Sequence, residues 1–133
     1  DMAYYSFAKA ICNGSDVTLY EGDALARDFT YIADVVTAVL AVLAKPPAQG
    51  SARVLNIGNH RPESVRYLVQ LLEQELGRPA RIALKPRPEA DVETTWANIE
   101  AIEALTGWQP TTQLAQGIAQ FVAWFKAYEN TDA

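Results

Sequence analysis

The sequence is poor in cysteine, in histidine and in long apolar runs, and each shortage excludes a class of protein. Cys12 is the only cysteine and His60 is the only histidine, so the chain can form neither an internal disulfide nor a metal site rich in thiolate or imidazole ligands. No apolar run reaches the roughly 20 residues that span a bilayer, and no basic region leads into an apolar stretch at the N-terminus. We therefore expect a cytoplasmic chain with no membrane segment and no metal.

Basic residues are outnumbered and scattered. Eleven Lys and Arg stand against 16 Asp and Glu, which gives a net charge of −5, and this balance argues against nucleic acid or an anionic membrane as a partner. A single localised anion site is still compatible with it. Half of the 133 residues are hydrophobic, which is enough for a sizeable core, so we expect residues 1–133 to form a single domain.

The pattern of apolar residues predicts an α/β or α+β fold with about five helices and four short strands. Helices are expected over residues 4–11, 35–43, 65–76, 99–105 and 114–125, and strands over 17–20, 29–32, 53–57 and 81–84. The expected helix caps are Asp34, Ser64, Asn98 and either Thr111 or Thr112, because their side chains can accept hydrogen bonds from the free N–H groups of a first turn. The helix after Asp34 has almost no polar face, so we expect neighbours to cover it on most sides.

Few residues suggest catalysis or cofactor binding. No glycine-rich turn of the GxGxxG type joins an expected strand to a helix, so the sequence offers no cradle for a dinucleotide such as NAD. His60 lies in the polar string NHRPE and is expected to be a solvated loop residue. Cys12 lies near the C-terminal end of a helix, where the helix dipole disfavours a thiolate, so we expect it to be a packing residue.

Arg27 is different, because it opens the string RDFTYIAD at the start of an expected apolar strand. Its guanidinium offers a planar fork suited to a phosphate or a carboxylate. An ion pair with Asp28 or Glu21, closing the end of the strand, is an equally good interpretation. Composition alone leaves both open.

Several strings in a fixed order resemble the NAD-dependent epimerase/dehydratase family, the extended short-chain dehydrogenase/reductase enzymes that act on nucleotide sugars. RDFTYIADVV closely matches a signature of that family, and DMAYYSFAKAI, VTLYEGD, VLNIGN and LTGWQPTTQLAQGIAQFVAWF match its other landmarks. The resemblance covers essentially the whole chain and is strongest to UDP-glucuronate 4-epimerases. It implies the C-terminal, substrate-binding portion of such an enzyme, without the Rossmann domain.

The resemblance also implies roles for five residues. Arg27 would bind the diphosphate of a UDP-sugar, Thr18 and Tyr20 would flank the uracil largely through backbone groups, and Asp91 would lie in the loop that closes over the ribose. Relatives carry a Gln or Arg before Pro-Gly-Asp in this loop, whereas this chain reads PEAD. The side-chain contact is therefore lost or passes to Arg87.

In that family NAD is bound by the Rossmann domain, and hydride transfer uses the Tyr and Lys of a YxxxK motif. The resemblance places these parts upstream of this chain. Tyr5 and Lys9 also form a YxxxK string, one helical turn apart, as proton transfer by a phenol would require. Because no glycine-rich turn precedes them and the resemblance puts their helix after the catalytic one, we interpret the string as a coincidence. The chain alone is expected to bind no NAD and to have no epimerase activity.

Two other hypotheses follow from the same residues. One is a free-standing nucleotide-binding module. The other is a chain that self-associates through the apolar helix after Asp34, on the surface meant for the missing domain. Dehydratases and decarboxylases of the family share these motifs, so the sequence does not identify the sugar nucleotide or the reaction.

Overall fold

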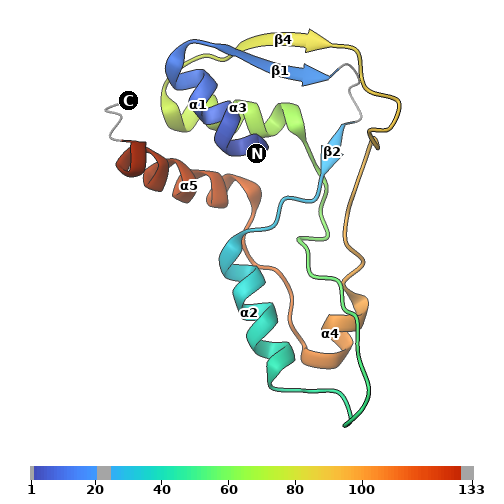
Figure 1. Cartoon of the computed structure of the whole chain (residues 1–133). Coiled ribbons are helices and arrows are strands. Elements are labelled where there is room, and N and C mark those ends of the chain that lie inside the picture. Colours follow the sequence, from blue (N-terminus) through green and yellow to red (C-terminus); the bar gives the residue numbers. More distant parts are fainter. Residues whose placement is uncertain (1, 21–24, 130–133) are drawn as a thin grey trace.

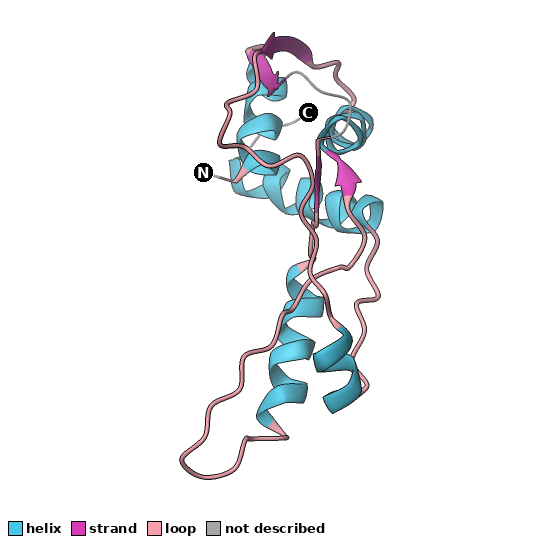
Figure 2. Ribbon diagram, turned by 90° about the vertical axis from the view of Figure 1, so that its right-hand side faces the viewer, coloured by secondary structure: helices cyan, strands magenta, loops and turns pink. Residues whose placement is uncertain are grey.

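The chain folds into two lobes joined by extended segments, as Figure 1 and Figure 2 show. The computed structural model describes residues 2–20 and 25–129. In chain order the elements are α1 (Ala3–Asn13), β1 (Asp16–Tyr20), β2 (Ala26–Arg27), α2 (Ile32–Leu43), β3 (Glu63–Ser64), α3 (Val65–Leu76), β4 (Arg81–Lys85), α4 (Glu100–Thr106) and α5 (Leu114–Glu129). This mixed content confirms the expected fold class, and β1 and β4 confirm the first and last of the four expected strands.

The core of the upper lobe lies between one face of a small parallel sheet and three helices. β1 pairs in parallel with β4, from Asp16 opposite Arg81 to Tyr20 opposite Lys85. Every second side chain of β1 is buried, and α3 packs against both α1 and α5. The buried residues of this core are Ala8, Ile11, Val17, Leu19, Leu68, Val69, Leu71, Leu72, Leu76, Leu114, Ile118, Val122 and Phe125. Because strand side chains alternate, Thr18 and Tyr20 lie on the opposite face of β1.

A second, smaller hydrophobic cluster forms the core of the lower lobe. Ala38 of α2 and Ile102 of α4 are fully buried there beside Trp108, whose Nε1 donates a hydrogen bond to Thr37 Oγ1 at 3.0 Å. Leu55, from the extended segment before β3, packs against the same cluster. The lower lobe is therefore held by side chains from α2, from α4 and from extended segments of the chain.

β2 lies where the two lobes meet. It pairs antiparallel with β3 on one side. On its other side Ala26 N donates to Glu93 O at 2.9 Å, and Thr95 N donates to Ala26 O at 3.3 Å. This two-residue strand is held between segments that are distant in sequence, and this pairing fixes the backbone of Arg27.

Local signals predicted the ends of α3 and α4 correctly. Ser64 caps α3, where its Oγ accepts a hydrogen bond from Tyr67 N at 3.0 Å. Gly77 ends the helix with a φ of 68°, the left-handed conformation that glycine adopts without strain. Asn98 Oδ1 accepts a hydrogen bond from Glu100 N at 2.9 Å at the start of α4.

Two of the four expected strands are wrong. Residues 29–32 lie outside any strand, and α2 already begins at Ile32. Tyr31 is instead held against α5, where its OH donates to Gln120 Oε1 at 2.7 Å. Residues 53–57 form no strand either. Residues 29–31 are half-buried, whereas Arg53, Val54 and Asn56 are exposed. Aromatic and β-branched residues also suit half-buried extended segments, so their presence does not by itself predict pairing with another strand.

The capping roles expected for Asp34 and the two threonines are also wrong, and for one shared reason. Asp34 lies inside the first turn of α2, and α5 begins only at Leu114. Asp34 Oδ1 accepts hydrogen bonds from Thr111 N at 3.2 Å and Thr111 Oγ1 at 3.0 Å, and its Oδ2 accepts one from Thr112 N at 2.9 Å. These polar groups therefore bind one another and join α2 to the chain that enters α5.

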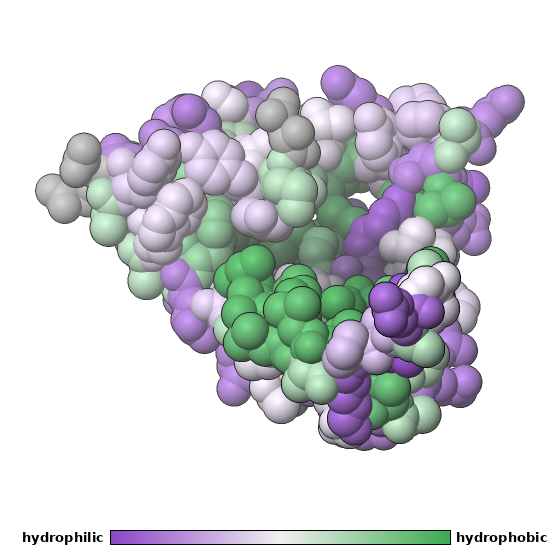
Figure 3. Space-filling view, turned by 60° about the horizontal axis from the view of Figure 1, so that its bottom comes forward, coloured by the Kyte–Doolittle hydropathy of each residue, from purple (hydrophilic) through white to green (hydrophobic). Residues whose placement is uncertain are grey.

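α2 is covered far less than its sequence led us to expect. Five of its large apolar side chains are exposed, namely those of Ile32, Val36, Val39, Leu40 and Leu43. Figure 3 shows a broad hydrophobic surface on the side of the molecule that faces down in Figure 1. The expectation that neighbours cover this helix on most sides is wrong for the described part of the chain.

Candidate functional site

Arg27 leaves β2 with its guanidinium held by three hydrogen bonds. Nη1 donates to Ala26 O at 2.9 Å and to Glu93 O at 3.0 Å. Nη2 forms an ion pair with Asp91 Oδ1 at 2.6 Å. The side chain is 28% exposed, so the charge is partly buried and fixed in direction. Arg27 Nε–H and the second hydrogen of Nη2 form no hydrogen bond within residues 2–20 and 25–129, which leaves two donors for another group.

Arg87 extends this group of charges. Its Nη1 donates to Asp91 O at 3.3 Å, and its Nη2 forms an ion pair with Glu93 Oε1 at 3.1 Å. We call Arg27, Arg87, Asp91 and Glu93 the arginine–acid cluster. Ion pairs near the surface stabilise a fold by only about 1 kcal/mol or less. The ion pairs of the arginine–acid cluster are therefore a minor source of stability.

Thr18 and Tyr20 lie on the neighbouring strand β1. Thr18 stands opposite Ala83 and Tyr20 opposite Lys85, in the strand that leads into the loop of the arginine–acid cluster. Tyr20 is exposed and Thr18 is half-buried. Within the described residues no hydrogen bond joins either side chain to the cluster. Glu21, one of the two ion-pair partners suggested for Arg27, lies outside the described residues.

Asp28 binds a different part of the chain from its neighbour. Its Oδ1 accepts a hydrogen bond from Asn59 N at 2.9 Å, and its Oδ2 accepts hydrogen bonds from Ala97 N at 2.8 Å and His60 N at 3.2 Å. The ion pair of Arg27 with Asp28 suggested by the sequence is not formed, because this carboxylate is already surrounded by backbone donors. Asp28 thus ties the segment after β2 to two other loops.

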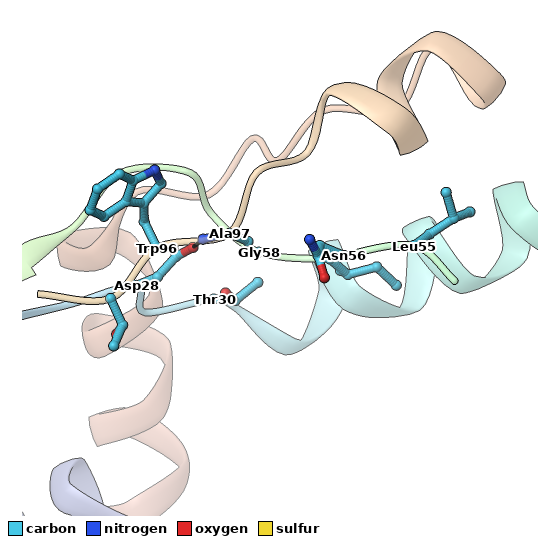
Figure 4. A pocket seen from close by; sticks show the side chains of 9 residues that line it. Asp28, Thr30, Leu55, Asn56, Gly58, Trp96 and Ala97 are labelled. Atoms are coloured by element: carbon cyan, nitrogen blue, oxygen red, sulfur yellow. Dashed lines mark hydrogen bonds between the residues drawn. The ribbon is translucent and has the colours of Figure 1, made fainter. Parts of the chain in front are cut away.

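A surface pocket of about 450 Å³ lies beside Asp28. Figure 4 shows Gly58, Ala97 and Trp96 at one end of it and Leu55 at the other. A Cβ at Gly58 would lie 2.5 Å from Ala97 Cβ and 2.6 Å from Asp28 Oδ2, so only glycine allows the chains to approach this closely. None of the five residues assigned from the family resemblance lines this pocket.

Tyr5 and Lys9, the two residues of the YxxxK string, both contact Glu129 at the end of α5. The Tyr5 hydroxyl donates a hydrogen bond to the Glu129 carboxylate, and Lys9 Nζ lies 3.9 Å from Glu129 Oε1. The hydrogen bond to Glu129 is the main cause that raises the pKa of Tyr5, and desolvation and the charge of Glu129 raise it further. Proton transfer at neutral pH requires the opposite shift. Tyr5 and Lys9 thus share a partner on α5, and the interpretation of the string as a coincidence stays a prediction.

His60 and Cys12 contact only other parts of the protein in the described residues. His60 is exposed, and its Nδ1 lies 3.2 Å from Ala97 O. Cys12 is half-buried and packs against the upper core. Among the described residues no group of three or more His, Cys, Asp or Glu side chains is arranged to hold a metal ion. No helix in the same part of the chain has the length and apolarity needed to cross a bilayer.

Reasoning from the sequence missed two residues that organise this region. Asp28 was considered only as a partner of Arg27, and Glu93 was not singled out at all. Glu93 contributes both its carbonyl oxygen, to Arg27, and its carboxylate, to Arg87. The adjacent charges at 27 and 28 were the only signal for Asp28, and no local pattern marks Glu93.

The sequence matches one family model and is similar to several UDP-glucuronate 4-epimerases. A family model described as GDP-mannose 4,6-dehydratase matches residues 4–121. The chain is 33% identical to a probable UDP-glucuronate 4-epimerase of Rhizobium meliloti across 94% of this chain. It is 37% identical to UDP-glucuronate 4-epimerase 4 of Arabidopsis thaliana across 99% of this chain. These alignments cover 41% and 33% of the two relatives, so the chain spans well under half the length of either.

The fold of this chain is also similar to part of a solved UDP-glucuronic acid 4-epimerase. The UDP-glucuronic acid 4-epimerase of Bacillus cereus was solved in complex with UDP-glucuronic acid and NAD. It matches with a TM-score of 0.84 at 26% identity, across 96% of this chain and 40% of that one. The two-lobed arrangement described above therefore resembles that of 40% of the Bacillus cereus chain.

Proposed function

We propose that this chain, which belongs to the GDP-mannose 4,6-dehydratase family of NAD-dependent epimerases and dehydratases, is the UDP-sugar-binding part of an epimerase like the UDP-glucuronate 4-epimerases. The relatives and the Bacillus cereus enzyme support the choice of reaction and nucleotide. A cytoplasmic location belongs to the same proposal.

The geometry of Arg27 is the observation that carries this proposal. The guanidinium is fixed by Ala26 O, Glu93 O and Asp91, and two of its donors have no partner in the described part of the chain. It would thus be oriented for an incoming anion. Charge-assisted hydrogen bonds of this kind are short, strong and directional. A diphosphate would accept from the two remaining donors, and Arg87 would contribute a second positive charge nearby.

The other assigned residues complete the proposed nucleotide site. Thr18 and Tyr20 would border the uracil along β1, and Asp91 would lie at the ribose, in the loop that also holds Arg87. In the proposed full enzyme, binding of the nucleotide would hold the reacting sugar carbon in a fixed position next to the cofactor.

We infer that NAD is bound outside this chain. A pyrophosphate cradle needs a glycine-rich turn that leads from a strand into the N-terminus of a helix. Among residues 2–20 and 25–129 the glycines with positive φ lie elsewhere, since Gly14, Gly77 and Gly107 follow helices and Gly50 lies in a loop. We therefore assign the NAD site of the proposed enzyme to the portion that the relatives have beyond this match, and expect no epimerase activity from residues 1–133.

Calorimetric titration with UDP tests the proposal. Arg27→Ala should weaken binding at least tenfold, because two charge-assisted hydrogen bonds at about 1.5 kcal/mol or more each are lost. Arg81→Ala is the matched control, since Arg81 is an exposed arginine paired with Asp16 away from the cluster, and it should bind UDP like the natural chain. Equal binding by both variants, or no binding of UDP at millimolar concentration, would remove the basis for the nucleotide site.

A further inference from the structure

A second surface pocket, of about 460 Å³, lies where α5 begins. Its walls come from the loop that follows Gly58, from the first turn of α3 and from residues 110–115. None of the five residues assigned to the nucleotide lines it. We call it the α5 pocket. A pocket of this volume is large enough to admit a small molecule the size of a monosaccharide.

Asn59 gives the first indication that the α5 pocket binds a molecule. It lines the pocket and is only 7% exposed, and its backbone N–H donates to Asp28 Oδ1. Its side-chain amide has two donor hydrogens and one acceptor oxygen, yet it forms no hydrogen bond within residues 2–20 and 25–129. Buried polar groups are nearly always paired, because leaving one without a partner costs free energy. The amide therefore indicates a partner that enters through the pocket.

The N-terminus of α5 supplies more free donors in the same pocket. The backbone N–H groups of Leu114 and Ala115 have no acceptor in the described part of the chain, as is usual in the first turn of a helix. α5 is 16 residues long, and its dipole places about half a positive charge at this end. Arg61 also lines the pocket, is exposed, and forms no ion pair among the residues that the structure describes. These groups together attract an anion.

Glu63 and Tyr67 limit which anion suits the α5 pocket. Both side chains are half-buried in its wall, and neither the carboxylate nor the phenol hydroxyl has a hydrogen-bond partner among the described residues. Arg61 and Glu63 carry opposite unit charges, so the helix dipole leaves the pocket with a net charge of roughly +0.5. This charge favours a monoanion over a dianion such as phosphate. Because a carboxylate only accepts hydrogen bonds, Glu63 suits hydroxyl groups on the same molecule.

We propose that the α5 pocket binds a monocarboxylate that carries several hydroxyl groups, of the size of a sugar acid. Its carboxylate accepts hydrogen bonds from the first turn of α5 and from Arg61. Its hydroxyl groups donate to Glu63, and one of them forms hydrogen bonds with the Asn59 amide. The site uses none of the residues of the arginine–acid cluster, so it does not depend on the proposed nucleotide site.

Titration of the ¹⁵N-labelled 133-residue chain with D-glucuronate, followed by NMR, tests this site. We expect saturable binding at millimolar concentration that shifts the signals of the Leu114 and Ala115 amides and of the Asn59 side chain. D-glucose has the hydroxyl groups without the charge, and inorganic phosphate, at a pH where it is a dianion, has charge without the sugar hydroxyl groups. Each should bind at least about tenfold more weakly than D-glucuronate.

Two variants identify the groups that bind D-glucuronate. Arg61→Ala should weaken binding by about tenfold, because a charge-assisted hydrogen bond is lost, and the exposed position of Arg61 keeps this test independent of folding. Arg66→Ala is the matched control, since Arg66 is also exposed but does not line the pocket, and it should bind like the natural chain. Asn59→Ala should also weaken binding. Its urea midpoint without D-glucuronate should not fall, because the amide has no partner in the described residues to lose.

The proposal is overturned if D-glucuronate does not bind at millimolar concentration, or if D-glucose or phosphate binds equally well. It is also overturned if Arg61→Ala and Asn59→Ala bind D-glucuronate like the natural chain. Arg27→Ala should leave this binding unchanged, whereas a loss in that variant would place D-glucuronate at the arginine–acid cluster and reject the α5 pocket. UDP binding is measured separately, so the two sites can fail independently.

Discussion

Replacing Asp34 by Asn should destabilise the chain strongly at neutral pH and much less at low pH. The Asp34 carboxylate is only 5% exposed and accepts three hydrogen bonds, from Thr111 N, Thr111 Oγ1 and Thr112 N. An Asn side chain keeps one acceptor oxygen and turns an NH₂ group toward a backbone N–H. At least one buried donor is then left without a partner.

The expected cost follows from these contacts. A hydrogen bond to a charged group contributes roughly 1.5–3 kcal/mol, and a buried donor without a partner costs about 1–3 kcal/mol. Because Asn retains part of the arrangement, we expect Asp34→Asn to lower the free energy of unfolding by about 2–4 kcal/mol at pH 7. Asp16→Asn is the control, since Asp16 is exposed and paired only with Arg81 at the surface, and it should cost about 0.5 kcal/mol or less.

The pH dependence has a definite sign. Burial raises the pKa of Asp34, but the hydrogen bonds from Thr112 and Thr111 outweigh it, so the pKa lies below the ordinary value of 3.8. A carboxyl whose pKa is lower in the folded state stabilises the fold above its unfolded pKa and loses that contribution as the pH falls through its folded pKa. The difference between the natural chain and Asp34→Asn should therefore shrink below about pH 4.

Urea denaturation followed by tryptophan fluorescence measures this difference at pH 7 and at pH 3. Trp108 reports on the lower lobe, because it is buried next to Ala38 of α2. A loss at pH 7 below about 0.5 kcal/mol would show that Asp34 does not join α2 to the chain before α5 as described. A loss of equal size at both pH values would refute the assignment of the effect to the ionised carboxylate.

Three further changes probe the loops and the helix ends. Gly58→Ala should lower the free energy of unfolding by about 1–3 kcal/mol in urea, because its Cβ would collide with Ala97 and Asp28; an unchanged midpoint would contradict the close approach. Asp91→Asn should tighten the binding of inorganic pyrophosphate several-fold in calorimetry, since it removes a negative charge that lies beside Arg27 and repels the anion; unchanged or weaker binding would argue against that repulsion. Glu129→Gln should lower the pKa of Tyr5 toward its ordinary value of 10.0, measured by NMR of ¹³C-labelled tyrosine, because Glu129 is the main cause of its rise; a higher pKa would contradict the contact.

The sequence predicted helices well because their signals are local. The stripe of α3 and its caps, Ser64 and Gly77, lie within a few residues of one another, so spacing and capping chemistry suffice. Residues 29–32 and 53–57 carry equally strong strand signals, yet neither is a strand. Tyr31 contacts α5, and Leu55 and Ile57 pack against the lower cluster. β-propensity does not distinguish such contacts from pairing with another strand.

The site could be predicted only in part, because its contacts join distant segments. Arg27 stands out from the sequence as a charge at the start of an apolar string. Its ion-pair partner lies 64 residues further along the chain, and no periodic pattern links two such positions. The family resemblance named Arg27, Arg87 and Asp91, and the structure brings these three together. It leaves Thr18 and Tyr20 on the adjacent strand, without a hydrogen bond to the others in the described residues.

The adjacent charges of Arg27 and Asp28 follow from the geometry of extended chain. Neighbouring side chains in such a segment point to opposite sides, so one pair of residues can serve two different loops. Arg27 binds Glu93 O and Asp91 on one side, and Asp28 binds the backbone at Asn59 and Ala97 on the other. An apolar residue at either position would leave one of these loops without its anchor. The loops that they hold therefore account for both charges at the start of this string, and the same contacts fix the direction of the Arg27 guanidinium.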